Sequence, residues 1–328
     1  MARVGTWLGI AAGGAAAVVA GGIAYGRFAA PHALPLPPAV EGERRVATRR
    51  AGPISYYVAG SGPPILLIHS INAAASAYEV GPFWQALRGE RRVYAVDLPG
   101  FGFSDRSERG YDVRLYVDAI HDVLDEIAVE SGGEAVDALA LSLSSEFLAR
   151  VANERPDAFR SLVLITPTGF ERGAHLRRGP ESGTREVKGL HVALNVPIWS
   201  RGLYNLLVSR PSIRYFLERT FGSKQIDEGL LDYDYLTAHQ PGAKNAPYAF
   251  VSGRLFSSDV RTLYERLTRP VLVLHGTRGD FQDFSEAEWT RSRPNWRIVP
   301  FDTGALPQFE RLPAVMAEMH AFLKAPPG

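Results

Sequence analysis

The sequence predicts an α/β fold with a mostly parallel central sheet, helices on both faces of that sheet, and an inserted helical cap. Short apolar, β-rich runs alternate with segments of helical periodicity over most of the 328 residues, as in parallel sheets that are covered on both faces. Several runs are continuous in Val, Ile and Leu, which is typical of strands buried on both sides. The alternation stops once, between two expected core strands, and this interruption indicates the cap.

The N-terminal segment, 1–28, differs from the rest of the chain. Its run 4–26 contains 23 residues without a charge, long enough to cross a hydrocarbon layer of roughly 30 Å as a helix. We therefore expect a membrane anchor. A cleaved secretory signal or a loosely ordered tail are alternatives, because most of the run is Ala and Gly. The excess of Arg after the run favours a cytoplasmic position for the folded domain, whereas a cleaved signal would make it periplasmic or secreted.

The segment 29–41 is expected to be an extended linker, because four prolines fall within 31–38. An α/β core follows over 42–170 and 255–328. Its expected strands are 54–58, 64–68, 92–96, 135–141, 161–165, 271–274 and 296–301. Helical periodicity is found over 111–127, after the strand at 135–141, and again near the C-terminus.

The cap is expected over 171–254, where basic and apolar residues are interleaved in the first part. One interpretation is a lid that packs its apolar side on the core and leaves its charges in solvent. The other is that basic and apolar groups together touch an anionic membrane surface. Both interpretations stay open at this point.

Composition excludes several classes of function. The chain has no cysteine, which excludes disulfides, thiolate metal sites and a cysteine nucleophile. A net charge of +1 gives no argument for a nucleic-acid partner. We expect no cofactor, and no metal site because no two histidines have metal-ligand spacing.

A candidate nucleophile stands in the sequence Ala-Leu-Ser-Leu-Ser, 140–144. Ser142 follows an expected buried strand and precedes an expected helix, the context of a nucleophile elbow. Such a turn needs small residues two positions before and after the serine, and Ala140 and Ser144 meet that need. The alternative is a buried serine that caps the following helix.

Three further segments support the first interpretation. They are Ile-Leu-Leu-Ile-His-Ser-Ile-Asn at 65–72, Asp-Leu-Pro-Gly-Phe-Gly-Phe-Ser-Asp at 97–105, and Val-Leu-Val-Leu-His-Gly-Thr-Arg-Gly-Asp at 271–280. With the serine segment, their order resembles that of the α/β-hydrolase superfamily, of the fold-1 type, over about 54–325. The resemblance implies a hydrolase fold with a cap, and most members of the superfamily are enzymes.

The resemblance also assigns roles. Ser142 is the nucleophile, the backbone N–H groups of Ile71 and Leu143 form the oxyanion hole, and His69 orders the oxyanion loop. Asp280 matches the catalytic acid, with the spacing one residue longer than usual, and Asp283 is a substitute.

The position of the histidine base is occupied by Ala305, in Gly-Ala-Leu-Pro-Gln-Phe-Glu at 304–310. Alanine cannot accept a proton, and loss of one member of a Ser-His-Asp triad typically costs about 10⁴ to 10⁶ in turnover. His275, at the end of an expected strand, and His239, in the cap, are candidate substitutes. Either must reach Ser142 to act as its base.

Two other departures are expected around the same pocket. Ser70 replaces a glycine after His69, and Ser144 and Ser145 replace the two glycines after the nucleophile. With Asn72 and Ser142, these side chains could line a cavity that holds a polar ligand.

The sequence therefore leads to two hypotheses of function. The first is an esterase- or lipase-like hydrolase with a degenerate triad, acting on a hydrophobic or amphiphilic small molecule. The second is a non-catalytic protein of the same fold that binds a ligand or a partner at a membrane.

Overall fold

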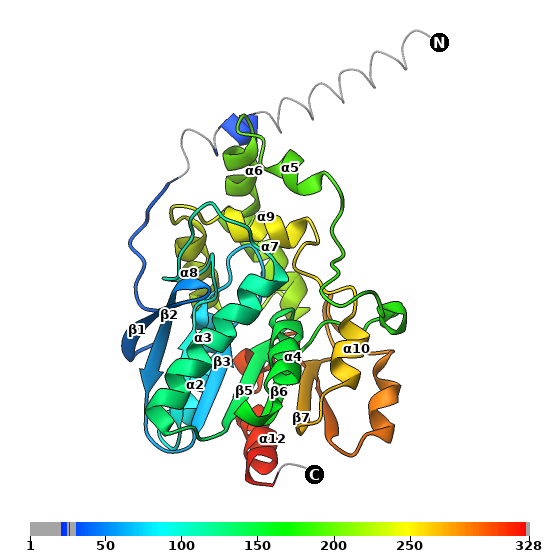
Figure 1. Cartoon of the computed structure of the whole chain (residues 1–328). Coiled ribbons are helices and arrows are strands. Elements are labelled where there is room, and N and C mark those ends of the chain that lie inside the picture. Colours follow the sequence, from blue (N-terminus) through cyan, green and yellow to red (C-terminus); the bar gives the residue numbers. More distant parts are fainter. Residues whose placement is uncertain (1–20, 25, 27–30, 326–328) are drawn as a thin grey trace.

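The centre of the fold is an eight-stranded sheet, seen in a computed structural model that describes residues 21–24, 26 and 31–325 (Figure 1). The strand order is β1-β2-β4-β3-β5-β6-β7-β8. β1 and β2 pair antiparallel, as do β2 and β4, and the remaining pairs are parallel. The strands are β1 (Glu43–Arg49), β2 (Gly52–Ala59), β3 (Pro64–Ile68), β4 (Arg92–Val96), β5 (Val136–Leu141), β6 (Phe159–Ile165), β7 (Val271–Gly276) and β8 (Trp296–Phe301). The expected α/β fold with a mostly parallel sheet is confirmed.

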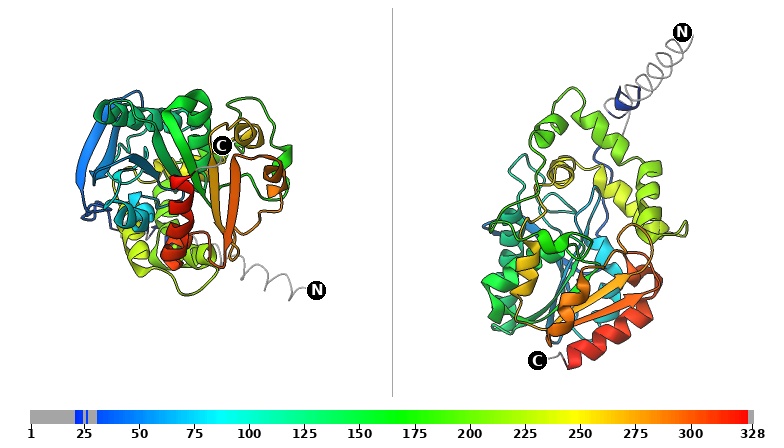
Figure 2. Two further views of the ribbon diagram at one scale, coloured as in Figure 1. Left: turned by 90° about the horizontal axis from the view of Figure 1, so that it is seen from below. Right: turned by 90° about the vertical axis from the view of Figure 1, so that its right-hand side faces the viewer.

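Helices cover both faces of the sheet. Successive residues of a strand point to opposite faces, and in β3 Leu66 and Ile68 join one apolar core while Ile65 and Leu67 join the other. The first core includes α3 (Val113–Ser131), α4 (Ser144–Glu154) and α10 (Val260–Glu265), and the second includes α2 (Gly81–Leu87) and α12 (Leu312–Lys324). The view from below shows the sheet between these two helical layers (Figure 2).

A group of helices separates β6 from β7, where the sequence predicts the cap. It comprises α5 (Leu190–Leu194), α6 (Ser200–Leu207), α7 (Arg210–Phe221), α8 (Glu228–Ala238) and α9 (Asn245–Val251), followed by α10. α6, α7, α8 and α9 lie over the end of the sheet that is uppermost in Figure 1. Ser142 follows the carboxyl end of β5, so these helices cover the edge of the sheet at which it stands. The bounds of the cap, 171–254, stay a prediction.

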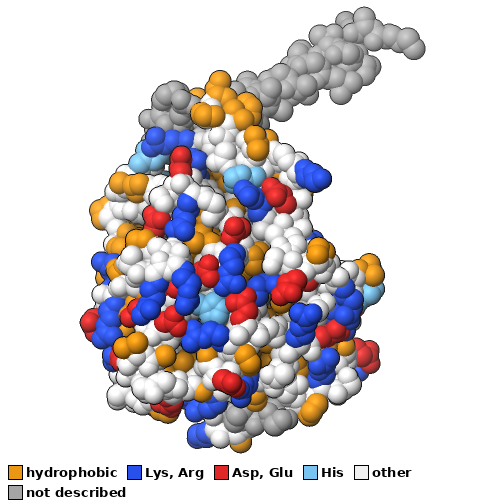
Figure 3. Space-filling view, in the orientation of Figure 1, with side chains coloured by type: hydrophobic (Ala, Val, Ile, Leu, Met, Phe, Trp, Pro, Cys, Tyr) orange, Lys and Arg blue, Asp and Glu red, His pale blue; other side chains and the backbone are white. Residues whose placement is uncertain are grey.

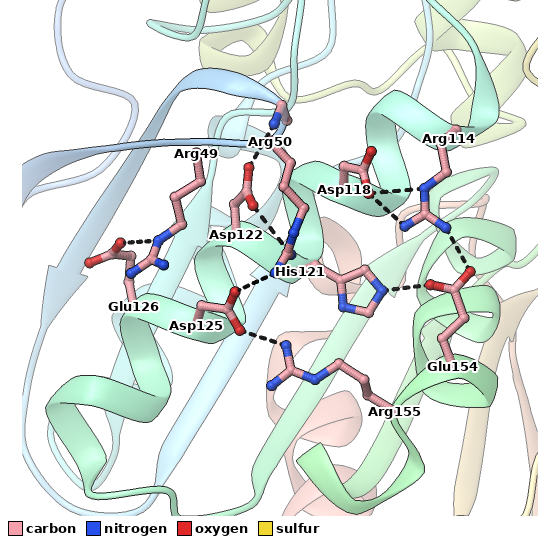
Figure 4. A network of polar contacts seen from close by, with 11 residues as sticks. Arg49, Arg50, Arg114, Asp118, His121, Asp122, Asp125, Glu126, Glu154 and Arg155 are labelled. Carbon is pink, nitrogen blue, oxygen red and sulfur yellow. Dashed lines mark hydrogen bonds and ion pairs between the residues drawn. The ribbon is translucent and has the colours of Figure 1, made fainter.

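A polar network fixes the two helices that flank the first core (Figure 4). The buried carboxylate of Asp122, in α3, accepts a hydrogen bond from the backbone N–H of Ala51 at 2.8 Å, in the turn between β1 and β2. Glu154, at the end of α4, accepts from Arg114 of α3 at 2.8 Å and contacts His121 at 2.7 Å. The network therefore fixes the position of α4, the helix that begins beside Ser142, relative to α3.

The expected anchor lies mostly outside the described residues, since only 21–24 and 26 of the run 4–26 are described. Within the described ranges, no helix has both the length and the apolar character needed to cross a bilayer. Gly26 and Ile23 lie against α6: the backbone oxygen of Gly26 accepts a hydrogen bond from Asn205, and a Cβ on Gly202 would lie 2.2 Å from the oxygen of Ile23. The linker continues along the cap, where Tyr233 donates a hydrogen bond to the Pro37 oxygen at 2.8 Å.

Candidate functional site

Ser142 occupies a sharp turn between β5 and α4. Its φ angle is +51°, a left-handed conformation that non-glycine residues rarely adopt. The turn is held by the backbone N–H of Ser142, which donates to the Ile165 oxygen of β6 at 2.9 Å. Ala140 and Ser144 on either side are fully buried, which explains why both positions need small residues. The geometry is that of a nucleophile elbow.

The turn opens into a cavity of about 140 Å³, here called the serine cavity. Six residues singled out in the sequence line it: Ser70, Ile71, Asn72, Ser142, Leu143 and Ala305. They come from three separate segments, after β3, after β5 and after β8. The fold thus brings together the segments that the sequence linked only by resemblance.

Two residues that line this cavity have backbone N–H groups without a partner among the described residues. Neither the Ile71 N–H nor the Leu143 N–H donates a hydrogen bond to another described residue. Buried backbone N–H groups are nearly always paired in proteins, so two free donors beside one serine require a ligand or water. They suit the negative charge that develops on a substrate oxygen during acyl transfer.

Glu79 shapes the loop that carries Ile71. Its buried carboxylate accepts from the Ser70 N–H at 2.7 Å, the Ser70 hydroxyl at 2.9 Å and the Asn72 amide at 2.8 Å. Burial raises the pKa of Glu79, and the hydrogen bonds from Ser70 and Asn72 act in the opposite direction. The polar groups of Ser70 and Asn72 are therefore engaged with Glu79 while their side chains line the cavity.

Ser144 and Ser145 lie elsewhere than the sequence suggested, because neither lines the serine cavity, and His69 does not line it either. All three are fully buried. The hydroxyl of Ser144 donates to the His69 oxygen at 2.6 Å, and His69 Nε2 accepts from the Leu98 N–H at 2.9 Å. Burial lowers the pKa of His69 to about 4. These residues hold the loop and the elbow together beneath the cavity.

The two candidate substitute bases do not line the serine cavity either. His275 contacts its neighbour's backbone, with Nδ1 2.9 Å from the Gly276 oxygen, and its ring stacks on Phe284 at 3.7 Å between centroids. His239 lines a different cavity, of about 660 Å³, with its Nδ1 2.7 Å from the Tyr235 oxygen. The structure brings neither histidine to Ser142.

Ala305, which the sequence resemblance aligns with the histidine base, lies in the wall of the serine cavity. Its backbone is fixed on both sides: its N–H donates to the Thr220 oxygen at 2.9 Å, and its oxygen accepts from the Thr166 hydroxyl at 2.8 Å. Within the described residues, no histidine lines this cavity.

The expected acids are engaged with other groups. Asp280 forms a two-pronged ion pair with Arg219 of α7, at 2.5 and 2.8 Å. Asp283 is exposed and accepts from the backbone of Arg172 and Ser285 at 3.0 Å. These hydrogen bonds, with that from Arg172 contributing most, lower the pKa of Asp283 to about 2.

Among the residues that line the serine cavity, those that sequence reasoning missed include Glu79, Thr166 and Asp234. Thr166 directly follows β6 and has a φ of +44°, so a second left-handed residue lines the same cavity as Ser142. Asp234, in α8, has a carboxyl group that is 4% exposed. No local motif marks any of the three, because each reaches the cavity through the tertiary fold.

Comparisons with known proteins agree with this geometry. Residues 65–318 match the sequence profile of the alpha/beta hydrolase family. A 2-(acetamidomethylene)succinate hydrolase from Mesorhizobium japonicum is 27% identical over 244 residues, covering 73% of this chain and 80% of the relative. A 2-hydroxymuconate semialdehyde hydrolase from Pseudomonas putida is 32% identical over 111 residues, which cover 34% of this chain and 38% of the relative.

Solved structures show the same fold. A meta-cleavage product hydrolase from Pseudomonas fluorescens superposes with a TM-score of 0.65 at 20% identity, covering 86% of this chain and 97% of the other. A probable hydrolytic enzyme from Pseudomonas aeruginosa gives a TM-score of 0.66 at 19% identity, covering 87% and 95%. At these identities the structural likeness supports the fold alone.

Proposed function

Since the chain belongs to the alpha/beta hydrolase family, we propose that it is a hydrolase in which Ser142 attacks an ester-like bond of a hydrophobic or amphiphilic small molecule. One observation carries this proposal: Ser142 stands in a left-handed turn and lines a cavity with the unpartnered N–H groups of Ile71 and Leu143. That arrangement suits attack by the serine oxygen and stabilisation of the resulting oxyanion.

The proposed chemistry is slow. Among the described residues, no histidine lines the serine cavity to assist Ser142. An unassisted serine hydroxyl is a weak nucleophile at neutral pH. The titratable side chains that line the cavity are the carboxyl groups of Glu79 and Asp234. Any protein group that accepts the Ser142 proton there is therefore a carboxylate.

The lining of the serine cavity does not suit the substrate named for one relative. One relative is named for a succinate, which carries carboxylate groups. No Lys, Arg or His among the described residues lines the serine cavity, so a dianionic ligand would find no countercharge there.

A second candidate function is ligand binding without turnover. Ala305 in the wall of the serine cavity favours it, because the position that would hold the base carries only a methyl group. In this case the same cavity and the same donors hold a ligand whose bonds stay intact.

A covalent serine probe separates the two candidates. Purified protein is treated with a fluorophosphonate, beside Ser142→Ala and Ala305→His, and intact mass is followed over time. We expect slow labelling of the native protein, none of Ser142→Ala, and labelling at least tenfold faster of Ala305→His, because a histidine can take the proton from Ser142.

Two results would contradict the hydrolase proposal. Labelling of Ser142→Ala at the native rate would show that another residue reacts. Labelling of Ala305→His alone would support the binding candidate, since the native site would then hold a serine that is not activated.

We also propose that the protein associates with a membrane. The uncharged run 4–26 supports this proposal. So does its described end, which lies against α6, near exposed apolar side chains of the cap.

A further inference from the structure

Asp234 lies where two cavities meet. It lines the serine cavity and also a neighbouring cavity of about 360 Å³, here called the cap cavity. Most of the cap cavity is apolar, with Leu207, Ile213, Phe216 and Phe250 among its lining residues. A ligand that extends from Ser142 into the cap cavity therefore has an apolar path with one carboxyl group beside it.

The carboxyl group of Asp234 is buried without a partner. Its exposure is 4%, and Oδ1 has no hydrogen-bond partner among the described residues. A buried, unpaired carboxyl group is costly, and proteins normally pair such groups or place them at functional sites. Glu79, the other buried acid of the serine cavity, is by contrast satisfied by Ser70 and Asn72.

Among the described residues, neither cavity has a Lys, Arg or His in its wall. Asp280, the other acid of the cap cavity, is paired with Arg219. Burial raises the pKa of Asp234 well above its ordinary value, and the charge of Glu79 adds to that effect. A ligand that carries its own positive charge would favour the ionised form of Asp234 and pair with it.

We propose that Asp234 recognises a protonated amine of the ligand, whose apolar body fills the cap cavity. This inference rests on the proposed function, because it takes the cavity of Ser142 as the ligand site. The ammonium group and the carboxylate form a charge-assisted hydrogen bond in a site that excludes most water. An anionic ligand would find no countercharge among the described residues that line the serine cavity.

The test uses three probes that share one apolar body and differ at one end: 4-phenylbutylamine, 4-phenylbutan-1-ol and 4-phenylbutyrate. Their affinities are measured by calorimetry at pH 7 with the full chain carrying Ser142→Ala, so that no reaction contributes heat. We expect the amine to bind at least tenfold more tightly than the alcohol, and the carboxylate to bind most weakly.

Asp234→Asn should abolish this preference. We expect it to weaken amine binding at least tenfold while changing alcohol binding less than threefold, because the amide keeps the size of the side chain and removes its charge. The control is Asp232→Asn, two residues earlier in α8, where the carboxylate is 61% exposed and pairs with Arg210. This control should leave all three affinities unchanged.

The inference is overturned if no amine binding is detected at 10 mM probe, or if the carboxylate binds as tightly as the amine. It is also overturned if Asp234→Asn keeps the native preference. If the Asp234→Asn variant does not fold, the relative affinities of the Ser142→Ala chain for the three probes still test the inference. If amines fail while Ser142 reacts with the fluorophosphonate, the hydrolase proposal survives alone. If the amine is preferred while Ser142 does not react with the fluorophosphonate, the recognition of an amine by Asp234 survives and the hydrolase proposal fails.

Discussion

At the scale of single residues, backbone strain marks the candidate site. Ser142 and Thr166 directly follow the neighbouring strands β5 and β6 and lie in the left-handed region, at φ values of +51° and +44°. Such a conformation costs about 1 to 3 kcal/mol for a non-glycine residue, and β-branched Thr166 is especially unusual there. Both residues line the serine cavity. Of the four described non-glycine residues with positive φ, Ala33, Ser142, Thr166 and Ser182, only Ser142 and Thr166 line this cavity.

Glu146 gives a prediction about pH. This fully buried acid of α4 accepts hydrogen bonds from the Thr168 hydroxyl at 2.5 Å and the Ser257 N–H at 2.8 Å. Burial raises its pKa to about 7, against the effect of those hydrogen bonds. The folded protein therefore holds a proton at pH values where the unfolded chain has lost it. This contribution to stability is complete below about pH 4 and is lost as the pH rises through 7.

Glu146→Gln should remove that loss, because glutamine resembles the protonated acid in shape and charge. We expect the free energy of unfolding of the variant, relative to native protein, to increase from pH 5 to about pH 7 and to level off at higher pH. The full difference is on the order of 3 kcal/mol. Urea denaturation across this range measures it. A constant difference would contradict the prediction, and the exposed Glu288→Gln serves as the control.

Some individual residues of the candidate site could be predicted from the sequence. Ser142, Ile71, Leu143 and Ala305 converge as expected because their segments follow core strands, and parallel strands end at one edge of a sheet. Asp234 and Glu79 were missed because neither lies in a recognisable motif. Their role depends on burial, which is a property of the packed fold.

At the scale of elements, α8 carries Asp234 into the cavities and depends on its first turn. Asp227 caps the helix, since its carboxylate accepts from the Leu230 N–H at 2.7 Å. Leu230 is itself buried and lines the serine cavity. The cap residue therefore links the start of α8 to the wall of the candidate site.

Asp227→Ala should lower the free energy of unfolding by about 1 kcal/mol, the usual cost of losing such a cap. We expect the loss to be local, with faster amide hydrogen exchange in the first turn of α8. Asp227→Asn should restore most of the protection, because the amide oxygen can accept the same hydrogen bond. Asp232→Ala, on the exposed side of α8, is the matched control, and equal exchange in both Ala variants would refute the capping role.

Strands could be predicted from the sequence more easily than cap helices. β3 and β5 are buried along their whole length, and continuous apolar runs reveal such strands. β1 was missed because only Ala47 of its seven residues is buried. Several cap helices are short, with α5, α6 and α9 spanning five to eight residues, so each offers few turns in which a helical period can be recognised.

At the scale of the whole molecule, two apolar features lie at one end. Residues 21–24 stand beside α6, at the top of Figure 1, and the right-hand view of Figure 2 shows the same proximity. Hydrophobic side chains gather on the surface there, whereas charges of both signs are interspersed over the middle of that face (Figure 3). We call the segment 190–199, from α5 to the start of α6, the cap tip. Its exposed side chains include Val192 and Trp199, at 72% and 40% exposure.

The position of the cap tip supports association with a bilayer, because residues 21–24, a described part of the uncharged run 4–26, lie at the same end of the molecule. A helix inserted through that run would hold the tip near the membrane surface, where Trp is favoured. The sequence indicated both features separately. It could not place them side by side, since that depends on the close approach of Ile23 to Gly202.

Flotation with lipid vesicles tests this arrangement. With vesicles of phosphatidylcholine and phosphatidylglycerol, we expect the full chain to float and deletion of residues 2–20 to reduce the bound fraction at least tenfold. In the full chain, Val192→Glu with Trp199→Glu should cause a smaller, two- to threefold loss, because the tip contributes only surface contacts. Val129→Glu, an exposed apolar position in α3 outside the tip, should have no effect. Equal flotation with and without residues 2–20 would show that the run does not hold the protein at the bilayer.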